Sequence, residues 1–205
     1  MILKIKKFKY FYPEKPVLMT VDQELFQDLS DDDDWIAEPK YNGNRCVLWV
    51  IDGQVEFWGR HGKKLKYNDD PDPEIVKEMS TKFPKGVFLF DSELRHNKVK
   101  GIRDKLVIWD VFIWRDELLN KIQYWSRRAM LEVRIEDMDT TKISLIVQHR
   151  TDFKAAFEKY CNDPTDEFEG LVMKNVHGIL NIGRMSAANS LWMMKVRKPS
   201  GRYKF

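Results

Sequence analysis

A lysine beside a tight turn is the first residue of this 205-residue chain that could do chemistry. Pro39 biases the backbone of Glu38 toward the extended region, and Gly43 predicts either a positive φ or a close backbone approach. A lysine just before such a turn can project into a cleft, which makes Lys40 a candidate nucleophile. The same residues also fit a surface lysine next to an Asn-Gly turn. The choice between these two interpretations depends on the other segments.

Carboxylates and cations recur in pairs on three later segments. Asp91 and Glu93 are two residues apart in a predicted strand, so both side chains point to one face. Paired carboxylates on an apolar strand are costly unless a metal, a base or hydroxyl groups meet them. Each segment alone fits an ordinary edge strand with charged ends, but the three segments together favour a functional site. The remaining pairs are Glu169 with Lys174, and Lys195 with Arg197.

The elements that must position these residues are predicted from periodicity and turn signals. Asp52-Gly53 is a type I′ turn signal and predicts a β-hairpin, and the helix from Tyr124 is expected to turn Met130, Leu131 and Val133 inward. Helices are expected over 20–29, 73–83, 124–138 and 152–161. Strands are expected over 45–51, 55–58, 86–94, 105–114, 144–148, 170–175 and 191–198. Paired strands with few intervening helices predict an α+β fold.

Length and composition narrow the class of protein. We expect a single domain over 1–205, because no repeat, low-complexity tract or linker divides the chain. The 35 Lys and Arg against 32 Asp and Glu give a net charge of +3, which excludes a polycation but allows a local basic groove. No apolar run approaches the ~20 residues of a membrane span, and the N-terminus lacks signal-peptide features. Two cysteines without metal-ligand spacing predict an intracellular, cytoplasmic protein.

Six segments, in order and covering about positions 38 to 198, resemble ATP-dependent DNA ligases and mRNA capping enzymes. Lys40–Arg45 resembles the KxDGxR nucleotidyl-lysine motif of that superfamily. Two residues depart from the ligase pattern: Asn42 stands where the pattern has Asp, and Ser92 where Gly is common. Some RNA ligases also depart from Asp at the position of Asn42. The other segments that carry the resemblance are Arg60-His61-Gly62, Asp91–Leu94, Trp109-Asp110, Glu169–Lys174 and Lys195-Val196-Arg197.

The resemblance implies a nucleotidyltransferase domain with antiparallel sheets flanked by helices. Lys40 would attack the α-phosphate of ATP, expel pyrophosphate and carry AMP through a phosphoramidate bond. AMP would then pass to the 5′-phosphate of a nicked nucleic acid, and the neighbouring 3′-hydroxyl would seal the nick. DNA is the favoured substrate and RNA stays open. No glycine-rich phosphate loop is present, so other residues must hold the nucleotide.

The resemblance also assigns residues to the nucleotide and to Mg²⁺. Glu38, or the backbone beside it, would accept a hydrogen bond from the adenine amino group, and Trp109 would stack on the adenine. Mg²⁺ would be bound through Asp91, Glu93 or Glu169. The other expected contacts are Arg45 and Glu93 with the ribose, Arg60 with a phosphate, and Lys174, Lys195 and Arg197 with the triphosphate.

Nucleic-acid contact is expected from local charge. The stretch from Arg95 to Lys105 is the favoured basic segment, since it lies beside the expected site in the sequence. Ligases and capping enzymes carry a further OB-fold domain after the last motif, and this chain is expected to hold none. It would then be either a truncated or a naturally minimal enzyme. We expect it to act as a monomer. The alternatives are an RNA ligase, a GTP-dependent capping-type guanylyltransferase, and a non-catalytic nucleic-acid-binding module. The other basic residues are Lys4, Lys6, Lys7 and Lys9, and Arg197, Lys198, Arg202 and Lys204.

Overall fold

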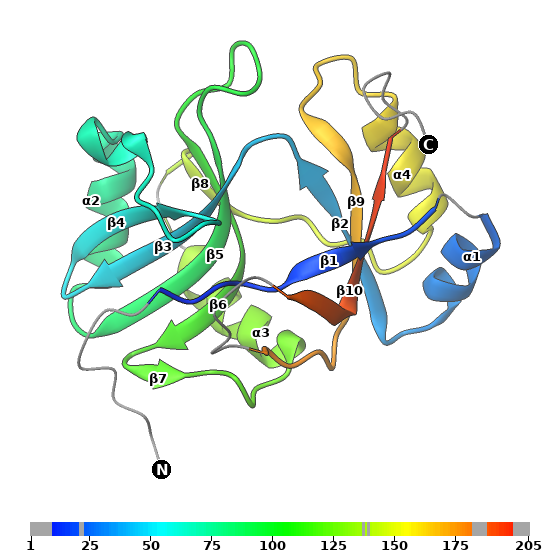
Figure 1. Cartoon of the computed structure of the whole chain (residues 1–205), viewed down its shortest axis with the longest axis horizontal. Coiled ribbons are helices and arrows are strands. Elements are labelled where there is room, and N and C mark those ends of the chain that lie inside the picture. The colour runs from blue at the N-terminus through cyan, green and yellow to red at the C-terminus, as the bar shows by residue number, and fades with distance from the viewer. Residues whose placement is uncertain (1–9, 21–22, 137, 139, 182–187, 199–205) are drawn as a thin grey trace. The chain divides into compact units, whose positions relative to one another are not determined.

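A computed structural model describes residues 10–20, 23–136, 138, 140–181 and 188–198 (Figure 1). Its contacts divide the chain into two compact units. Unit 1 comprises Met1–Glu14, Gly43–Ile146 and Ile179–Ala188, and unit 2 comprises Lys15–Asn42, Val147–Gly178 and Asn189–Phe205. Each unit is described by itself, and the single domain expected from the sequence stays a prediction.

Unit 2 is built on a four-stranded sheet covered by two helices. The strands lie in the order β1 (Lys15–Leu18), β10 (Asn189–Arg197), β9 (Phe168–Asn175) and β2 (Trp35–Tyr41). Only the β1–β10 pair is parallel. Helices α1 (Gln23–Asp31) and α4 (Phe153–Cys161) supply the core that covers one face. That core includes Phe26, Ala37, Phe153, Phe157, Leu171, Met173 and Val196.

Unit 1 is built on a six-stranded sheet. Its order is β4 (Gln54–Gly59), β3 (Asn44–Ile51), β5 (Val87–Arg95), β6 (Lys105–Trp114) and β7 (Glu117–Leu118), and β8 (Ile143–Leu145) pairs with β6 in parallel. A 3₁₀ turn, η1 (Lys66–Asp69), and helices α2 (Pro73–Lys82) and α3 (Tyr124–Ile135) complete the unit. Alternate residues of β3 and β5, such as Leu48 and Phe90, pack with Ile75, Met79 and Leu131 in one apolar core.

The α+β class predicted from the sequence is confirmed, and so is the first hairpin. Asp52 and Gly53 have φ values of 47° and 79°, as a type I′ turn requires. The helix expected over 152–161 is also present as α4, and its N-cap is Asp152, whose side chain accepts a hydrogen bond from the Ala155 N–H. One inward-facing prediction is wrong, because the Val133 side chain on α3 is 70% exposed.

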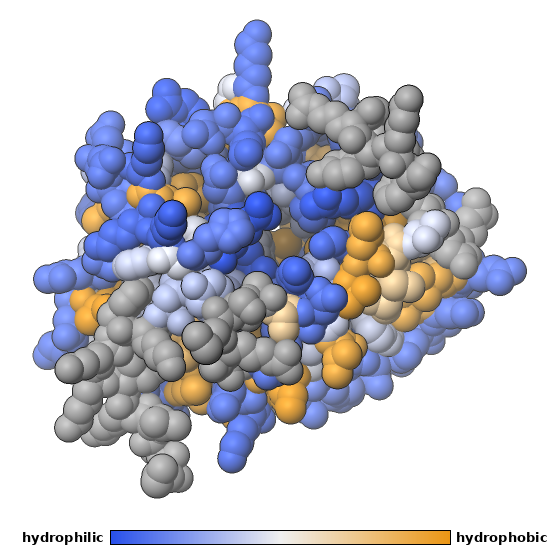
Figure 2. Space-filling view, viewed as in Figure 1, coloured by the Kyte–Doolittle hydropathy of each residue, from blue (hydrophilic) through white to orange (hydrophobic). Residues whose placement is uncertain are grey.

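The face of the molecule drawn in Figure 2 is mainly polar. Figure 2 shows hydrophilic side chains over most of the face in view, with apolar residues in scattered groups. No helix in the described ranges is long and apolar enough to cross a membrane.

Candidate active site

One face of the unit 2 sheet collects the predicted charged residues. Strand register pairs Lys40 with Gly170 and Gly170 with Arg197, and it pairs Glu38 with Val172 and Val172 with Lys195. Directly paired residues lie on the same face of an antiparallel sheet. Ala37 and Met173, which alternate with them, face the helices. The face opposite the helical core therefore carries Glu38, Lys40, Lys174, Lys195 and Arg197.

The amino group of Lys40 is held by a carboxylate. Lys40 Nζ donates a short hydrogen bond to Glu169 Oε2, and Arg197 Nη2 lies 3.6 Å from the same oxygen. The Lys40 and Glu169 side chains are 21% and 33% exposed, so a ligand can reach both. This cluster brings together a candidate nucleophile, a hydrogen-bond acceptor and a second cation.

A backbone irregularity brings Glu169 to this cluster. In a regular strand Glu169 would share the core face of Leu171, but the β2–β9 register shifts between Lys40 and Tyr41. Gly170 has a φ of +139°, and a Cβ built there would lie 2.0 Å from the Val196 carbonyl oxygen. A β-bulge re-aims a neighbouring side chain. Glycine at this position therefore lets β9 bend against β10 and turn Glu169 toward Lys40.

A buried ion pair lies two residues before Lys40. Lys174 Nζ is 2.6 Å from Glu38 Oε2, and the two side chains are 3% and 1% exposed. Gln148 Nε2 donates to the other oxygen, Glu38 Oε1, at 3.0 Å. Both Glu38 oxygens thus have protein partners, which leaves the neighbouring backbone as the better acceptor for an adenine amino group. The sequence carried no signal for this role of Gln148, which was only the last residue of the strand predicted over 144–148.

Asn42, the departure from the ligase pattern, has a local structural role. Its side-chain Nδ2 donates a hydrogen bond to the Asp166 carbonyl oxygen at 3.1 Å. Its backbone N–H donates to the Glu167 carbonyl oxygen at 2.8 Å. An ionised aspartate has no side-chain donor, so it could not make the first bond. The amide therefore matches the loop that precedes β9.

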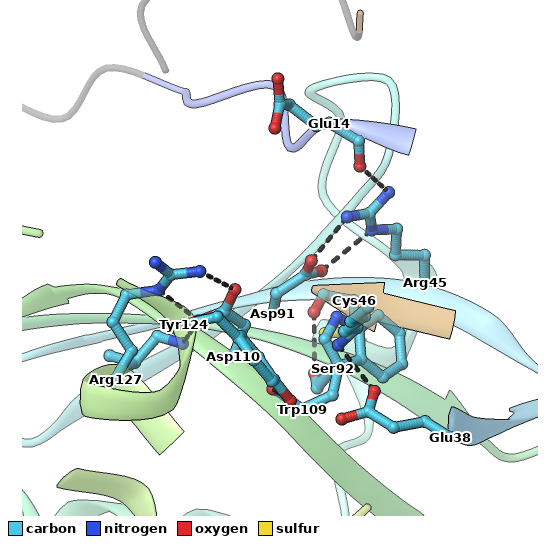
Figure 3. A network of polar contacts seen from close by, with 12 residues as sticks. Glu14, Glu38, Arg45, Cys46, Asp91, Ser92, Trp109, Asp110, Tyr124 and Arg127 are labelled. Atoms are coloured by element: carbon cyan, nitrogen blue, oxygen red, sulfur yellow. Dashed lines mark hydrogen bonds and ion pairs between the residues drawn. The ribbon is translucent and has the colours of Figure 1, made fainter. Parts of the chain in front are cut away.

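In unit 1, Arg45 is the centre of a polar network (Figure 3). Its guanidinium donates to Asp91 through Nε at 2.9 Å and Nη2 at 2.5 Å, and through Nη1 to the Glu14 carbonyl oxygen at 2.8 Å. Burial alone would lower the pKa of Arg45, but the Asp91 carboxylate and, more weakly, Glu93 raise it above its usual value. Arg45 is therefore a fixed, charged group on this sheet.

The predicted ribose and adenine residues lie around the same arginine. Glu93 is the direct partner of Arg45 in the β3–β5 register, and the Arg45 Cζ lies 5.9 Å from the centre of the Trp109 ring. Gly43 has no positive φ; instead, a Cβ there would lie 2.6 Å from Glu93 Cγ. Of the two reasons that the sequence offered for this glycine, close approach is the one that holds. Glu93 stands directly against the backbone just after Lys40–Asn42.

A second buried ion pair supports β6 (Figure 3). Arg127 from α3 donates through Nε and Nη2 to the two oxygens of Asp110, at 2.7 and 2.8 Å. Asp110 is the direct cross-strand partner of Asp91, so these neighbouring acids are each neutralised by a different arginine. The sequence did not indicate that a charged residue of the helix, Arg127, faces inward.

No preformed metal site exists among the described residues, since no three His, Cys, Asp or Glu side chains converge. Both Asp91 oxygens bind Arg45, so metal binding there would compete with that ion pair. Glu169 is part-exposed and lies next to Lys40. Mg²⁺ commonly binds through one or two carboxylates together with substrate phosphates, and Glu169 fits that mode.

The remaining predicted residues are more dispersed. Arg60 is exposed after β4, and its Nε donates to His61 Nε2 at 3.0 Å. In the Arg95–Lys105 stretch, Lys98 and Lys100 are exposed in the loop between β5 and β6. The basic residues outside the described ranges are Lys4, Lys6, Lys7, Lys9, Arg202 and Lys204.

Comparison with known proteins identifies the fold. No protein-family model and no curated protein matches the chain. A mycobacterial DNA ligase D complexed with ATP is 14% identical, with a TM-score of 0.65, over 90% of this chain and 60% of that one. The bacteriophage T7 ATP-dependent DNA ligase, also complexed with ATP, is 13% identical, with a TM-score of 0.53, over 91% of this chain and 68% of its own.

Chlorella virus DNA ligase-adenylate is 12% identical, with a TM-score of 0.50, over 91% of this chain and 69% of its own. The chain therefore has the fold of ATP-dependent DNA ligase nucleotidyltransferase domains, as the motif order predicted. It spans about 60% of the length of the DNA ligase D structure.

Proposed function

We propose that this chain is the lysine adenylyltransferase domain of an ATP-dependent polynucleotide ligase, with nicked DNA as its preferred substrate. One observation carries the proposal: Lys40 lies on a sheet face with Lys174, Lys195 and Arg197, and Glu169 accepts a hydrogen bond from its amino group. A charged face of this kind suits a nucleophile that must meet a triphosphate. The ligase-type fold agrees with it.

In the first step, the Lys40 Nζ lone pair forms an N–P bond to the α-phosphorus of ATP. The bond from that phosphorus to the oxygen bridging to the β-phosphate breaks, and its electron pair leaves with pyrophosphate. Before this attack the Lys40 ammonium group must lose one proton to free the lone pair, and Glu169, which already accepts its hydrogen bond, takes that proton. The second Nζ proton leaves with pyrophosphate as the phosphoramidate forms. Arg197 lies beside the same carboxylate, where it can bind a phosphate oxygen.

The other residues bind the nucleotide. Arg45 and Glu93 would contact the ribose, Trp109 would stack on the adenine, and Arg60 would bind a phosphate. Lys174 would stay paired with Glu38 and, with Lys195, would favour the triphosphate electrostatically. Bound Mg²⁺ would neutralise phosphate charge, with Glu169 the best-placed carboxylate and Asp91 and Glu93 the other candidates. AMP would then pass to a 5′-phosphate, and a 3′-hydroxyl would close the strand.

The deciding measurement is the intact-protein mass after incubation with ATP and Mg²⁺. We expect a gain of one AMP with ATP, none with GTP, and none in Lys40→Ala. Lys159→Ala is the matched control, because Lys159 is exposed on α4, the helix that covers the opposite face of the same sheet. It should be adenylylated like the original protein.

Each contrary result identifies an alternative. A GMP adduct would replace the proposal with a capping-type guanylyltransferase. A protein that is isolated without an adduct and gains none, yet binds nucleic acid, would be a non-catalytic module. Sealing of nicked RNA in preference to nicked DNA would make the chain an RNA ligase domain. We place the protein inside the cell, since both of its cysteines are free thiols. We expect it to act as a monomer.

A further inference from the structure

A cavity in unit 1 is lined by none of the predicted nucleotidyl residues. Its volume is about 460 Å³, and it opens between the end of α2, the start of β5, the β6–β7 turn and the last turn of α3. Phe88 lines this cavity, whereas Glu93 lies five residues along β5, a separation of about 17 Å at the usual rise of a strand. The cavity is therefore distinct from the Arg45 network.

The cavity combines an aromatic wall with a cationic rim. Phe83, Phe88 and Trp114 form the wall, and the Trp114 ring packs nearly perpendicular to the two phenylalanine rings, at centroid distances of 5.8 and 5.4 Å. These contacts hold the half-buried indole in one orientation. The rim carries four cations and one acid: Lys82, Lys85, Arg115, Arg134 and Asp116.

The rim cations differ in their ion pairing from two arginines inside unit 1. Arg45 and Arg127 each bind a buried carboxylate. Among the described residues, no salt bridge engages Lys82, Lys85, Arg115 or Arg134. Asp116, the one acid in the lining, keeps its single charge against the four cations, and its Oδ1 accepts a hydrogen bond from the Val87 N–H. The cavity thus presents excess positive charge beside an apolar surface.

We propose that this cavity is a second nucleotide-binding site. A nucleotide joins a planar aromatic base to a polyanion, which matches a tryptophan-containing wall beside four cations, of which Lys82 and Arg134 are half-buried. The volume lies within the range of small-ligand pockets. The nucleotide is either a free nucleoside triphosphate or a nucleotide within a nucleic-acid strand, since both offer the same chemistry. The site does not require Lys40.

Photolabelling with 8-azido-ATP, followed by peptide mapping, tests this site separately from Lys40. We expect a label on the segment 82–88 or 114–116 that excess ATP prevents. In Lys82→Glu/Arg134→Glu, labelling should require about tenfold more nucleotide or more, because the reversed charges repel the phosphates. Lys77→Glu/Lys121→Glu is the control, since it makes the same change of charge at exposed positions outside the cavity.

A second arm uses a 5′-phosphorylated oligonucleotide with one photoreactive base. Labelling of these segments by the free nucleotide supports the free-ligand source, and labelling by the oligonucleotide alone supports a strand. Absence of label from both probes would overturn the proposal, as would equal labelling of the two double variants. Because the readout is the labelled segment, loss of adenylylation at Lys40 would not affect the result.

Discussion

At the scale of single residues, the ionic partner of Lys40 decides how it can react. Glu169 accepts a hydrogen bond from the Lys40 amino group, and Arg197 shares the same oxygen. The order of motifs in the sequence predicted these three residues as parts of one site. It did not predict that Glu169 would contact Lys40 directly, because Glu169 reaches Lys40 through a bulge at Gly170.

Glu169→Gln should slow the adenylylation of Lys40. The amide keeps the size of the side chain but is a far weaker proton acceptor, so we expect a loss on the order of a hundredfold in rate. Time-resolved intact mass with ATP measures this rate. Glu158→Gln, an exposed change on α4, should leave the rate unchanged. Equal rates in all three proteins would show that Glu169 has no part in proton transfer.

The buried pair of Asp110 and Arg127 should be important for stability. Asp110→Asn removes the charge that neutralises a guanidinium whose side chain is 0% exposed, so the free energy of unfolding should fall by about 3 kcal/mol or more. Urea unfolding measures this change. In the control Glu132→Gln, the altered partner of Arg128 is 42% exposed, and the expected loss is at most about 1 kcal/mol. Similar losses in both variants would contradict the argument.

At the scale of elements, local signals predicted the first hairpin and the helices but not all strands. The β3–β4 hairpin was predictable because its turn residues need positive φ. Strand β2, which carries Lys40, was not predicted, because Pro39, Asn42 and Gly43 mark a turn. Its strand structure comes from pairing with β9, far along the chain. Val133 was placed inward by apolarity, yet the ion pair with Asp110 turns Arg127 inward instead.

The bulge in β9 should tolerate no side chain. Gly170→Ala would place a Cβ 2.0 Å from the Val196 carbonyl oxygen, which is backbone and cannot move alone. We expect the free energy of unfolding to fall by about 3 kcal/mol or more. Gly101→Ala is the control: its φ is +80°, but nothing lies within 4 Å, so backbone strain of about 1 kcal/mol is the whole cost. Equal costs would mean that the close approach to β10 is unimportant.

The start of α2 should make stability depend on pH. Asp72 caps the Glu74 and Ile75 N–H groups and lies 2.8 Å from Lys142 Nζ. Burial alone would raise the pKa of Asp72, but these hydrogen bonds lower it below its usual value. A depressed pKa contributes stability above the unfolded value of about 3.9, and that stability is lost as the pH falls through the lower folded value.

Asp72→Asn isolates this charge, because asparagine is also a good N-cap residue. We expect the variant to be less stable than the original protein at neutral pH and to lose less stability below about pH 4. Thermal or urea unfolding of both proteins at a series of pH values measures how the stability of each changes with pH. Parallel curves for the two proteins would show that the charge of Asp72 makes no contribution.

At the scale of the whole molecule, positive and negative residues are nearly equal in number but are unevenly distributed. The net charge is only +3, and the ligase-type fold by itself does not determine what the chain binds. Within unit 2, four positively charged side chains share the face opposite the helices. Within unit 1, Lys98 and Lys100 are exposed in the β5–β6 loop. Nucleic-acid affinity should therefore come from such local groups.

The exposed β5–β6 loop should contribute phosphate contacts to nicked DNA. If Lys98 and Lys100 each neutralise one phosphate, Lys98→Ala/Lys100→Ala should make the slope of log affinity against log salt concentration shallower by roughly 1.8. Fluorescence anisotropy with a labelled nicked duplex, at several salt concentrations, measures the slope. Lys77→Ala/Lys121→Ala removes the same charge from exposed positions outside this loop. If both double variants reduce the slope equally, general charge rather than the loop attracts the DNA; if neither does, the contacts lie elsewhere.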